Sequence, residues 1–406
     1  MSSAFSIPAF RRLWTAGLIS DAGDWLLFIA LPLVVYRLTG SALGTSLAFL
    51  LELIPAIALA PIAARLVNRL DRRWLMVCIN GLQAFALIPL LFVHSSADLP
   101  LIYVVICAQA ALGAAFEPAK NAMLPNLVGE QQLVSANALV GLNQNLGRLV
   151  GGPLGGVLLA VGDLGLVVAV DAISYALSAL MIWFVQRPTH RPGVGAATDA
   201  AEPVATGLLS VLRRRGLRGP LVIVFIASVS QGMFLVLFVL FVVDQLNGTD
   251  ADVGLLRGVQ AIGAIAAGFA LGVIGGRFSA RALTASSTLV FGVISLLTWN
   301  LPPVTTNIVP YVVLFILVGA PGVVMTTGLI SSLQSHSRDE ERGSVFTMLG
   351  VLSALGQAVG MLAAGLLDAP LGIVPLLEIQ GCIYLVAGCL AVRLIPREAV
   401  VTTPVR

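Results

Sequence analysis

Residues 219–245 read GPLVIVFIASVSQGMFLVLFVLFVVDQ, and Asp244 is the only charged side chain among them. As an α-helix this stretch would be about 40 Å long, which exceeds the hydrocarbon core of a bilayer, about 30 Å thick. In lipid every backbone N–H and C=O group must be bonded within the chain, so the stretch is expected to be helical. It is therefore predicted to cross a membrane as a helix.

Similar apolar runs fill the rest of the chain. The predicted spans are residues 12–36, 44–65, 74–94, 101–122, 137–161, 164–186, 219–245, 253–275, 280–299, 308–333, 344–367 and 371–395. Charged residues make up 11% of the chain, whereas soluble domains have about 25%. This composition excludes a water-soluble globular protein and predicts an all-α membrane protein with twelve transmembrane helices.

The basic residues indicate how the chain is oriented. If the N-terminus is cytoplasmic, 20 of the 23 basic residues fall in cytoplasmic segments, and only Arg37 falls in an outer loop. The outer loops carry acidic residues instead: Asp98, Asp163, Asp250, Asp252 and Asp368. Cytoplasmic loops are enriched in Lys and Arg, so both termini are predicted to be cytoplasmic. An odd number of spans would scramble this distribution, which supports the count of twelve.

The chain also reads as two similar halves. The predicted division is a six-helix bundle at 1–187, a polar cytoplasmic linker at 188–218 and a second six-helix bundle at 219–406. Arg69 and Arg73 follow the second span, and Arg277 and Arg281 follow the eighth with the same spacing, about 208 residues later. Two pseudo-symmetric six-helix repeats with a substrate site between them at the midplane are typical of a transporter.

Ionisable side chains lie deep within spans of the first half: Asp24, Glu52, Arg148 and Asp171. Charges inside a bilayer are costly and mark functional sites. Three acids and one arginine cannot all pair as charges, so we expect Arg148 to neutralise Asp171 and the other acids to take up protons. A purely structural role for the Arg148–Asp171 pair stays open beside a coupling role. Asp24 and Glu52 are the leading proton-coupling candidates, and Asp21 could assist Asp24.

Neutral polar side chains within the spans suggest a cavity for large amphipathic molecules. The candidates for lining it are Gln109, Asn143, Gln144, Gln231, Gln357 and Glu378. The three histidines lie far apart and the four cysteines have neither zinc nor disulfide spacing, so no metal site is expected. No phosphate loop, dinucleotide fingerprint or nucleophile elbow appears, so we expect no enzyme and no cofactor, with a proton gradient supplying the energy.

Four segments carry a family resemblance: FRRLW at 10–14, SDAGDW at 20–25, FEPAKNAMLPNLV at 116–128 and DAISY at 171–175. They resemble the drug-exporter branch of the major facilitator superfamily, which includes macrolide-efflux and enterobactin-exporter proteins. The resemblance covers essentially the full chain. It implies the major facilitator fold, in which two bundles rock against each other around a central cavity.

The resemblance also suggests roles for particular residues. It implies a cytoplasmic gate at Asn68, Arg69 and Arg73. Glu117 and Lys120 are three residues apart at the inner end of the fourth span, so we expect a local helix pair with a contact in that gate and not a proton site. Asn68 stands where the family has an aspartate, so it can hydrogen-bond but cannot form an ion pair. A glycine-rich run resembles the antiporter motif of exporters: Gly151, Gly152, Pro153, Gly155 and Gly156. Gln109 stands where many drug–proton antiporters have an arginine, which argues against a proton role at that position.

Together these features predict a monomeric, proton-coupled antiporter that exports amphipathic drugs and antibiotics across a bacterial inner membrane by alternating access. Its partners would be small amphipathic solutes and the lipid bilayer, with no nucleic acid. Export of one metabolite such as a siderophore, or flipping of a lysophospholipid, is the alternative within transport. A non-transporting membrane sensor or scaffold is the alternative from another class of protein.

Overall fold

The computed structural model describes residues 4–185, 214–338 and 341–396, and it contains no strand within these ranges. The described residues form two compact units. The first unit comprises residues 4–185 and Phe238–Ala261, and the second comprises 214–237 and the described residues from 262 onward. Most of the predicted linker, 188–213, lies outside the described residues, so the predicted domain boundaries stay a prediction.

Helices α1 to α7 belong to the first unit. They are α1 (Pro8–Thr39), α2 (Ala42–Ala58), α3 (Ala60–Arg69), α4 (Arg72–Ala86), α5 (Leu99–Val128), α6 (Leu133–Val161) and α7 (Leu164–Trp183). Short 3-10 turns accompany them at η1 (Ala4–Ser6), η2 (Ile88–Phe92), η3 (Ser96–Asp98) and η4 (Glu130–Gln132).

The remaining helices follow the predicted spans of the second half. They are α9 (Arg215–Leu240) with a π-helical turn η5 (Phe241–Gln245), α10 (Asp250–Ile274) with a 3-10 turn η6 (Gly275–Arg277), α11 (Ala280–Trp299), α12 (Ile308–His336), α13 (Arg342–Leu371) and α14 (Ile373–Leu394). α9 and α10 each contribute residues to both units.

The prediction of an all-α membrane protein with twelve transmembrane helices is confirmed. Among the described residues, ten helical segments are long and apolar enough to cross a membrane, and the bent pair α2–α3 adds an eleventh. The one remaining predicted span, 137–161, corresponds to α6, which forms a helix close to these bounds. Its polar residues, such as Asn143, Gln144 and Arg148, lower its hydropathy.

The second predicted span is broken rather than straight. α2 and α3 meet at an angle of 49°. Pro55 lies inside α2 and Pro61 in the first turn of α3. Proline lacks a backbone N–H and clashes with the preceding turn, so two prolines six residues apart favour a break at the intervening Leu59. The span predicted as 44–65 is therefore two helices.

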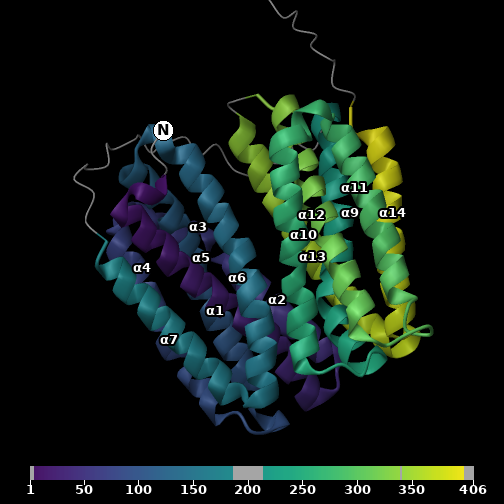
Figure 1. The fold of residues 1–406 in the computed structure, drawn as a ribbon, viewed down its shortest axis with the longest axis horizontal. Helices are drawn as coiled ribbons and strands as arrows, with labels where there is room; N and C mark the ends of the chain where they lie inside the picture. The colour runs from purple at the N-terminus through teal and green to yellow at the C-terminus, as the bar shows by residue number, and fades with distance from the viewer. Residues whose placement is uncertain (1–3, 186–213, 339–340, 397–406) are drawn as a thin grey trace, which may run out of the picture. The chain divides into compact units, whose positions relative to one another are not determined.

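α1 is the central helix of the first unit. It packs along both α6 and α7, whereas α6 and α7 have little contact with each other, and Figure 1 shows α1 between them. In the second unit α11 packs against α12 and α14, as α4 packs against α5 and α7 in the first. The two units thus repeat one pattern of neighbours.

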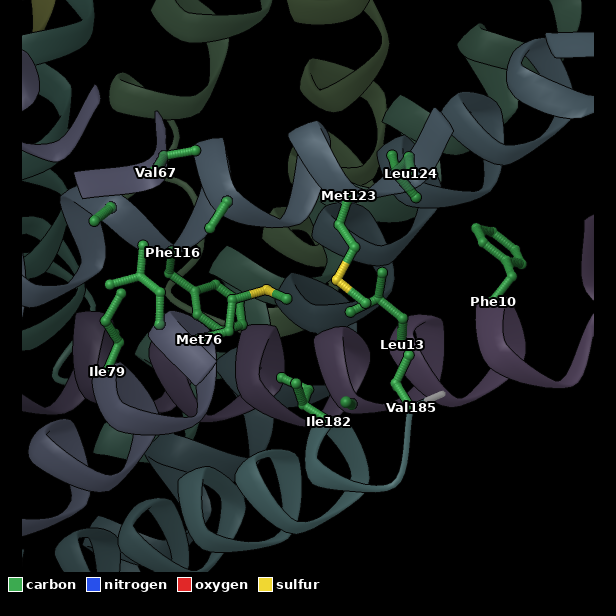
Figure 2. Packing of buried hydrophobic residues seen from close by; sticks show 14 of the residues in the cluster. Phe10, Leu13, Val67, Met76, Ile79, Phe116, Met123, Leu124, Ile182 and Val185 are labelled. Carbon is green, nitrogen blue, oxygen red and sulfur yellow. The ribbon is translucent and has the colours of Figure 1, made fainter. Parts of the chain in front are cut away.

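A hydrophobic cluster holds one end of the first unit together. Its members come from η1, α1 and α3 to α7, and they include Phe10, Leu13, Met76, Phe116 and Met123. Figure 2 shows Met123 of α5 reaching toward Leu13 of α1. Because lipid is as apolar as these side chains, the hydrophobic effect does not drive the helices together. Close packing of the side chains holds the helices in place relative to one another.

Candidate functional site

An acid and a tyrosine join α1 to α7. Tyr175 is 2% exposed, and its hydroxyl donates a hydrogen bond to the carboxylate of Asp24. The same hydroxyl accepts a hydrogen bond from Gln83 of α4 over 3.3 Å. Asp24 itself is exposed, although its carboxylate bonds to this buried hydroxyl. A hydroxyl can donate or accept, which lets Tyr175 stay bonded to Asp24 whether or not the acid carries a proton.

Asp171 lies one turn from Tyr175 on α7 and is fully buried. The hydroxyl of Ser174 donates to one of its oxygens over 2.9 Å, and the second oxygen has no partner among the described residues. A Cβ atom at Gly23 of α1 would collide with both Asp171 and Ser174. Gly23 therefore makes room for a buried carboxyl between α1 and α7.

The expected ion pair between Arg148 and Asp171 is absent from the described part of the chain. Arg148 instead donates to Asn145 over 3.2 Å on its own helix, and its guanidinium lies 5.6 Å from the centre of the Trp25 ring. The expectation was wrong because Arg148 is on α6 and Asp171 is on α7, and α1 lies between those two helices.

A buried lysine gathers charges from two helices. Lys120 is 1% exposed and pairs with Glu117 one turn away on α5. Its ammonium also lies 4.0 Å from the carboxylate of Asp21 on α1. Asn143 of α6 packs at the same place, donating to the backbone oxygen of Trp14 over 2.8 Å. The structure thus contains the expected Glu117–Lys120 pair. Asp21, which was expected to assist Asp24, instead lies beside this pair.

The predicted coupling residues therefore occupy separate places. Asp24 and Asp171 lie at the contact of α1 with α7, Asp21 lies in the lysine cluster, and Arg148 lies on Trp25. Glu52 is half-buried on α2 and makes no hydrogen bond or ion pair with the residues that the structure describes.

The predicted gate residues on α3 and α4 differ in their exposure and in their hydrogen bonds. Asn68 and Arg69 are exposed at the end of α3. Arg73 donates to the backbone oxygen of Val185 over 2.9 Å, just beyond the end of α7. Arg12 does the same to Phe184 over 2.8 Å. A helix C-terminus presents unpaired carbonyls and partial negative charge, so two guanidinium groups fix this end of α7.

The glycine motif brings α6 close to α1. A Cβ atom at Gly151 would collide with the backbone oxygen of Ala22, and one at Gly155 would lie 2.8 Å from the backbone oxygen of Leu26. Small residues at such positions let two helix backbones approach each other. Gly151 and Gly155 are thus required by the α1–α6 contact.

The remaining residues of the motif face α10 within the first unit. A Cβ atom at Gly152 would lie 3.2 Å from the backbone oxygen of Gly254. Gly258 of α10 lies against the ring of Pro153, and Gly156 lies against the first turn of α10. The motif therefore has two faces, one for each neighbouring helix.

The predicted cavity residues of the first unit differ in their surroundings. Gln109 of α5 donates to the backbone oxygen of Gln83 over 2.9 Å, which leaves its own side-chain oxygen buried and without a partner in the described residues. Asn143 is buried in the lysine cluster. Gln144 is exposed. Gln109 and Asn143 thus serve as links between helices.

In the second unit, Gln231 of α9 accepts a hydrogen bond from Tyr384 of α14 over 3.3 Å. Gln357 bonds to Ser353 on its own helix over 3.4 Å. Glu378 is half-buried and lines a groove on the exposed face of α14. Whether Gln231 and Gln357 line a substrate cavity stays a prediction.

The tyrosine contact occurs once in each unit. Tyr384 follows Tyr175 by 209 residues, and Gln231 follows Asp24 by 207. Tyr384 bonds to Gln231 as Tyr175 bonds to Asp24. The second unit thus has an amide where the first has an acid.

At two neighbouring positions the second unit also lacks the polar or acidic residue that the first unit has. Gln380 takes the place of Asp171 and accepts a hydrogen bond from the Trp299 ring nitrogen over 3.0 Å. Phe291 takes the place of Gln83, and its ring centre lies 4.3 Å from that of Tyr384. The acids of this contact are therefore confined to the first unit.

Sequence reasoning assigned no role to Tyr175, although it ends the DAISY segment. Its spacing from Tyr384 matches the repeat of about 208 residues and would have singled it out. The sequence prediction for Lys120 was limited to a role in the cytoplasmic gate. Lys120 is the one lysine in a chain with 22 arginines, which marks it as a residue with its own requirement.

Comparison with known proteins follows the same division into halves. The family model described as Major Facilitator Superfamily matches residues 13–241 and 220–406. Macrolide efflux protein A of Streptococcus pyogenes is 24% identical over 372 residues, which cover 90% of each chain. Multidrug efflux pump Tap of Mycolicibacterium fortuitum is 25% identical over 366 residues, which cover 86% of this chain and 87% of that protein.

Solved structures share the fold. A bacterial homologue of the iron transporter ferroportin, in an inward-facing state, gives a TM-score of 0.72 at 15% identity, over 96% of this chain and 99% of that one. A bacterial homologue of the lysosomal transporter Spinster gives 0.75 at 12% identity, over 97% and 98%. The family match over both halves identifies this chain as a member of the Major Facilitator Superfamily, a membrane transporter and not an enzyme.

Proposed function

We propose that this transporter is a proton-coupled exporter of amphipathic drugs, which acts as a monomer in a bacterial inner membrane with both termini in the cytoplasm. Relatives named as macrolide and multidrug efflux proteins support export. The excess of basic residues in the predicted cytoplasmic segments supports the orientation. The proton gradient is the energy source, and no cofactor is required.

The contact of Asp24 with Tyr175 carries the proposal. Asp24 is an exposed residue whose carboxylate has a buried phenol as its partner, inside a bundle that is otherwise mostly apolar. An acid in such a place alternates between a charged form, which water must reach, and a neutral form, which the bundle tolerates. Proton binding from outside would favour release of the solute, and proton loss to the cytoplasm would reset the carrier.

The test is drug uptake into inverted membrane vesicles under an imposed pH gradient, with erythromycin and ethidium as probes. We expect Asp24→Asn to abolish the accumulation driven by the gradient, because an amide cannot exchange a proton. Tyr175→Phe removes a hydrogen bond to a charged group, so we expect uptake to fall about tenfold.

Asp163→Asn is the matched control. Asp163 caps the exposed start of α7, where asparagine caps as well as aspartate does, so uptake should not change. Accumulation by Asp24→Asn that still follows the pH gradient would remove Asp24 from the mechanism. Uptake of a single compound from a panel of unrelated drugs would favour a dedicated metabolite exporter.

A further inference from the structure

A groove of about 460 Å³ lies between α9 and α14 in the second unit. Ile226 of α9 forms one side, and Ile379 and Cys382 of α14 are part of the other. Ile379 is 44% exposed. The opposite face of α14 packs on α11, and α14 lies at an edge of its unit (Figure 1). The groove therefore opens away from the helices of its own unit, where a membrane-spanning helix meets lipid.

Glu378 is the only charged side chain that lines this groove. It is half-buried and makes no hydrogen bond or ion pair within residues 4–185, 214–338 and 341–396. When Tyr175 and Tyr384 are aligned, the corresponding residue of the first unit is Ala169. The carboxyl is thus no part of the repeat, and no structural partner accounts for it. An ionisable side chain beside lipid is costly, which favours a binding role.

The groove is polar at one end only. Glu378 lies five residues after Ile373, where α14 begins, so it is about 8 Å along the helix. Cys382 and Val386 continue the groove one and two turns deeper. A carboxylate about 8 Å inside the helix is therefore followed by an apolar surface that continues toward the middle of the helix.

We infer that this groove binds a membrane-dissolved amphiphile that carries a protonated amine. The amine pairs with Glu378, about 8 Å inside the start of α14, and the hydrocarbon part lies along Cys382 and Val386. A neutral amphiphile would leave the carboxylate unpaired, and an anionic one would be repelled. The inference and the proposed function concern the same class of solute. The binding itself does not depend on the proposed function, because it needs no proton gradient.

The test is photolabelling of the full-length protein in phosphatidylglycerol vesicles, which contain no amine lipid. Two diazirine probes share a dodecyl chain and differ in the head group, a primary ammonium against a hydroxyl. We expect the ammonium probe to label α14, and Glu378→Gln to weaken its apparent affinity roughly fivefold. Glu378→Asp should retain binding. The hydroxyl probe should label wild type and Glu378→Gln alike.

Equal affinity of the ammonium probe for wild type and Glu378→Gln would overturn the inference. Loss of the labelling when phosphatidylethanolamine is added, in wild type but not in Glu378→Gln, would support the inference and identify the amphiphile as an amine lipid. A protein that binds the ammonium probe at Glu378 yet shows no uptake driven by pH would refute the proposed function and leave this site standing.

Discussion

At the scale of single residues, Lys120 explains how two acids are held beside each other. Its ammonium pairs with Glu117 and lies 4.0 Å from Asp21, in a place that is almost inaccessible to water. A lysine ammonium is compact and donates in three directions, whereas a guanidinium is planar and larger. This difference accounts for a lysine at position 120 in a chain that uses arginine everywhere else.

Replacing Lys120 should therefore destabilise the first unit. Lys120→Met leaves Asp21 and Glu117 without a cation, and breaking a buried ion pair costs roughly 3 kcal/mol. We expect a clear fall in the melting temperature of the purified protein in detergent. The double variant Lys120→Met/Asp21→Asn should recover part of that loss, because one unpaired charge is removed with its partner. An unchanged melting temperature for Lys120→Met would mean that the cluster contributes nothing to stability.

At the scale of helices, the contact of α1 with α6 depends only on those glycines of α6 that face the backbone of α1. Gly151 faces the backbone of α1, whereas Gly141, on the same helix, has open space around the position of a Cβ atom. The sequence shows both as glycines in one apolar helix and cannot tell them apart. Their difference comes from the neighbour that each one faces.

The same substitution should thus have different effects on stability at the two positions. Gly151→Ala places a methyl group against the backbone oxygen of Ala22, so we expect a loss of about 2 kcal/mol in stability. Gly141→Ala meets nothing, and it should be neutral or stabilise α6 by up to about 1 kcal/mol, because alanine favours the helix. Melting temperatures in detergent distinguish the two. An equal effect of both changes would show that α1 and α6 separate enough to admit a side chain.

Helix existence was predictable, whereas side-chain pairing was not. Apolar runs set the twelve spans because lipid leaves the backbone no alternative to a helix. The break in the span 44–65 was not predicted, although Pro55 and Pro61 could have indicated it. The Arg148–Asp171 pair was predicted wrongly because order along the chain does not reveal that α1 separates α6 from α7. Contacts of this kind depend on which helix faces are buried together.

At the scale of the whole molecule, the two halves repeat one scaffold but differ in charge. Tyr175 and Tyr384 hold corresponding places, yet the first bonds to an acid and the second to an amide. A duplicated fold can keep its packing while only one copy retains a group that titrates. We therefore expect proton exchange at this contact to belong to the first unit alone.

This asymmetry predicts that Gln231 and Asp24 respond differently to replacement. Gln231→Leu removes the partner of Tyr384 but no titratable group, so uptake into inverted vesicles should remain dependent on the pH gradient, even if the solute binds less tightly. Asp24→Asn should lose that dependence. The measurement is the ratio of uptake with and without the gradient, at several solute concentrations, for both variants and wild type. Loss of the gradient dependence in Gln231→Leu would show that both halves take part in coupling, and that the repeat is functional as well as structural.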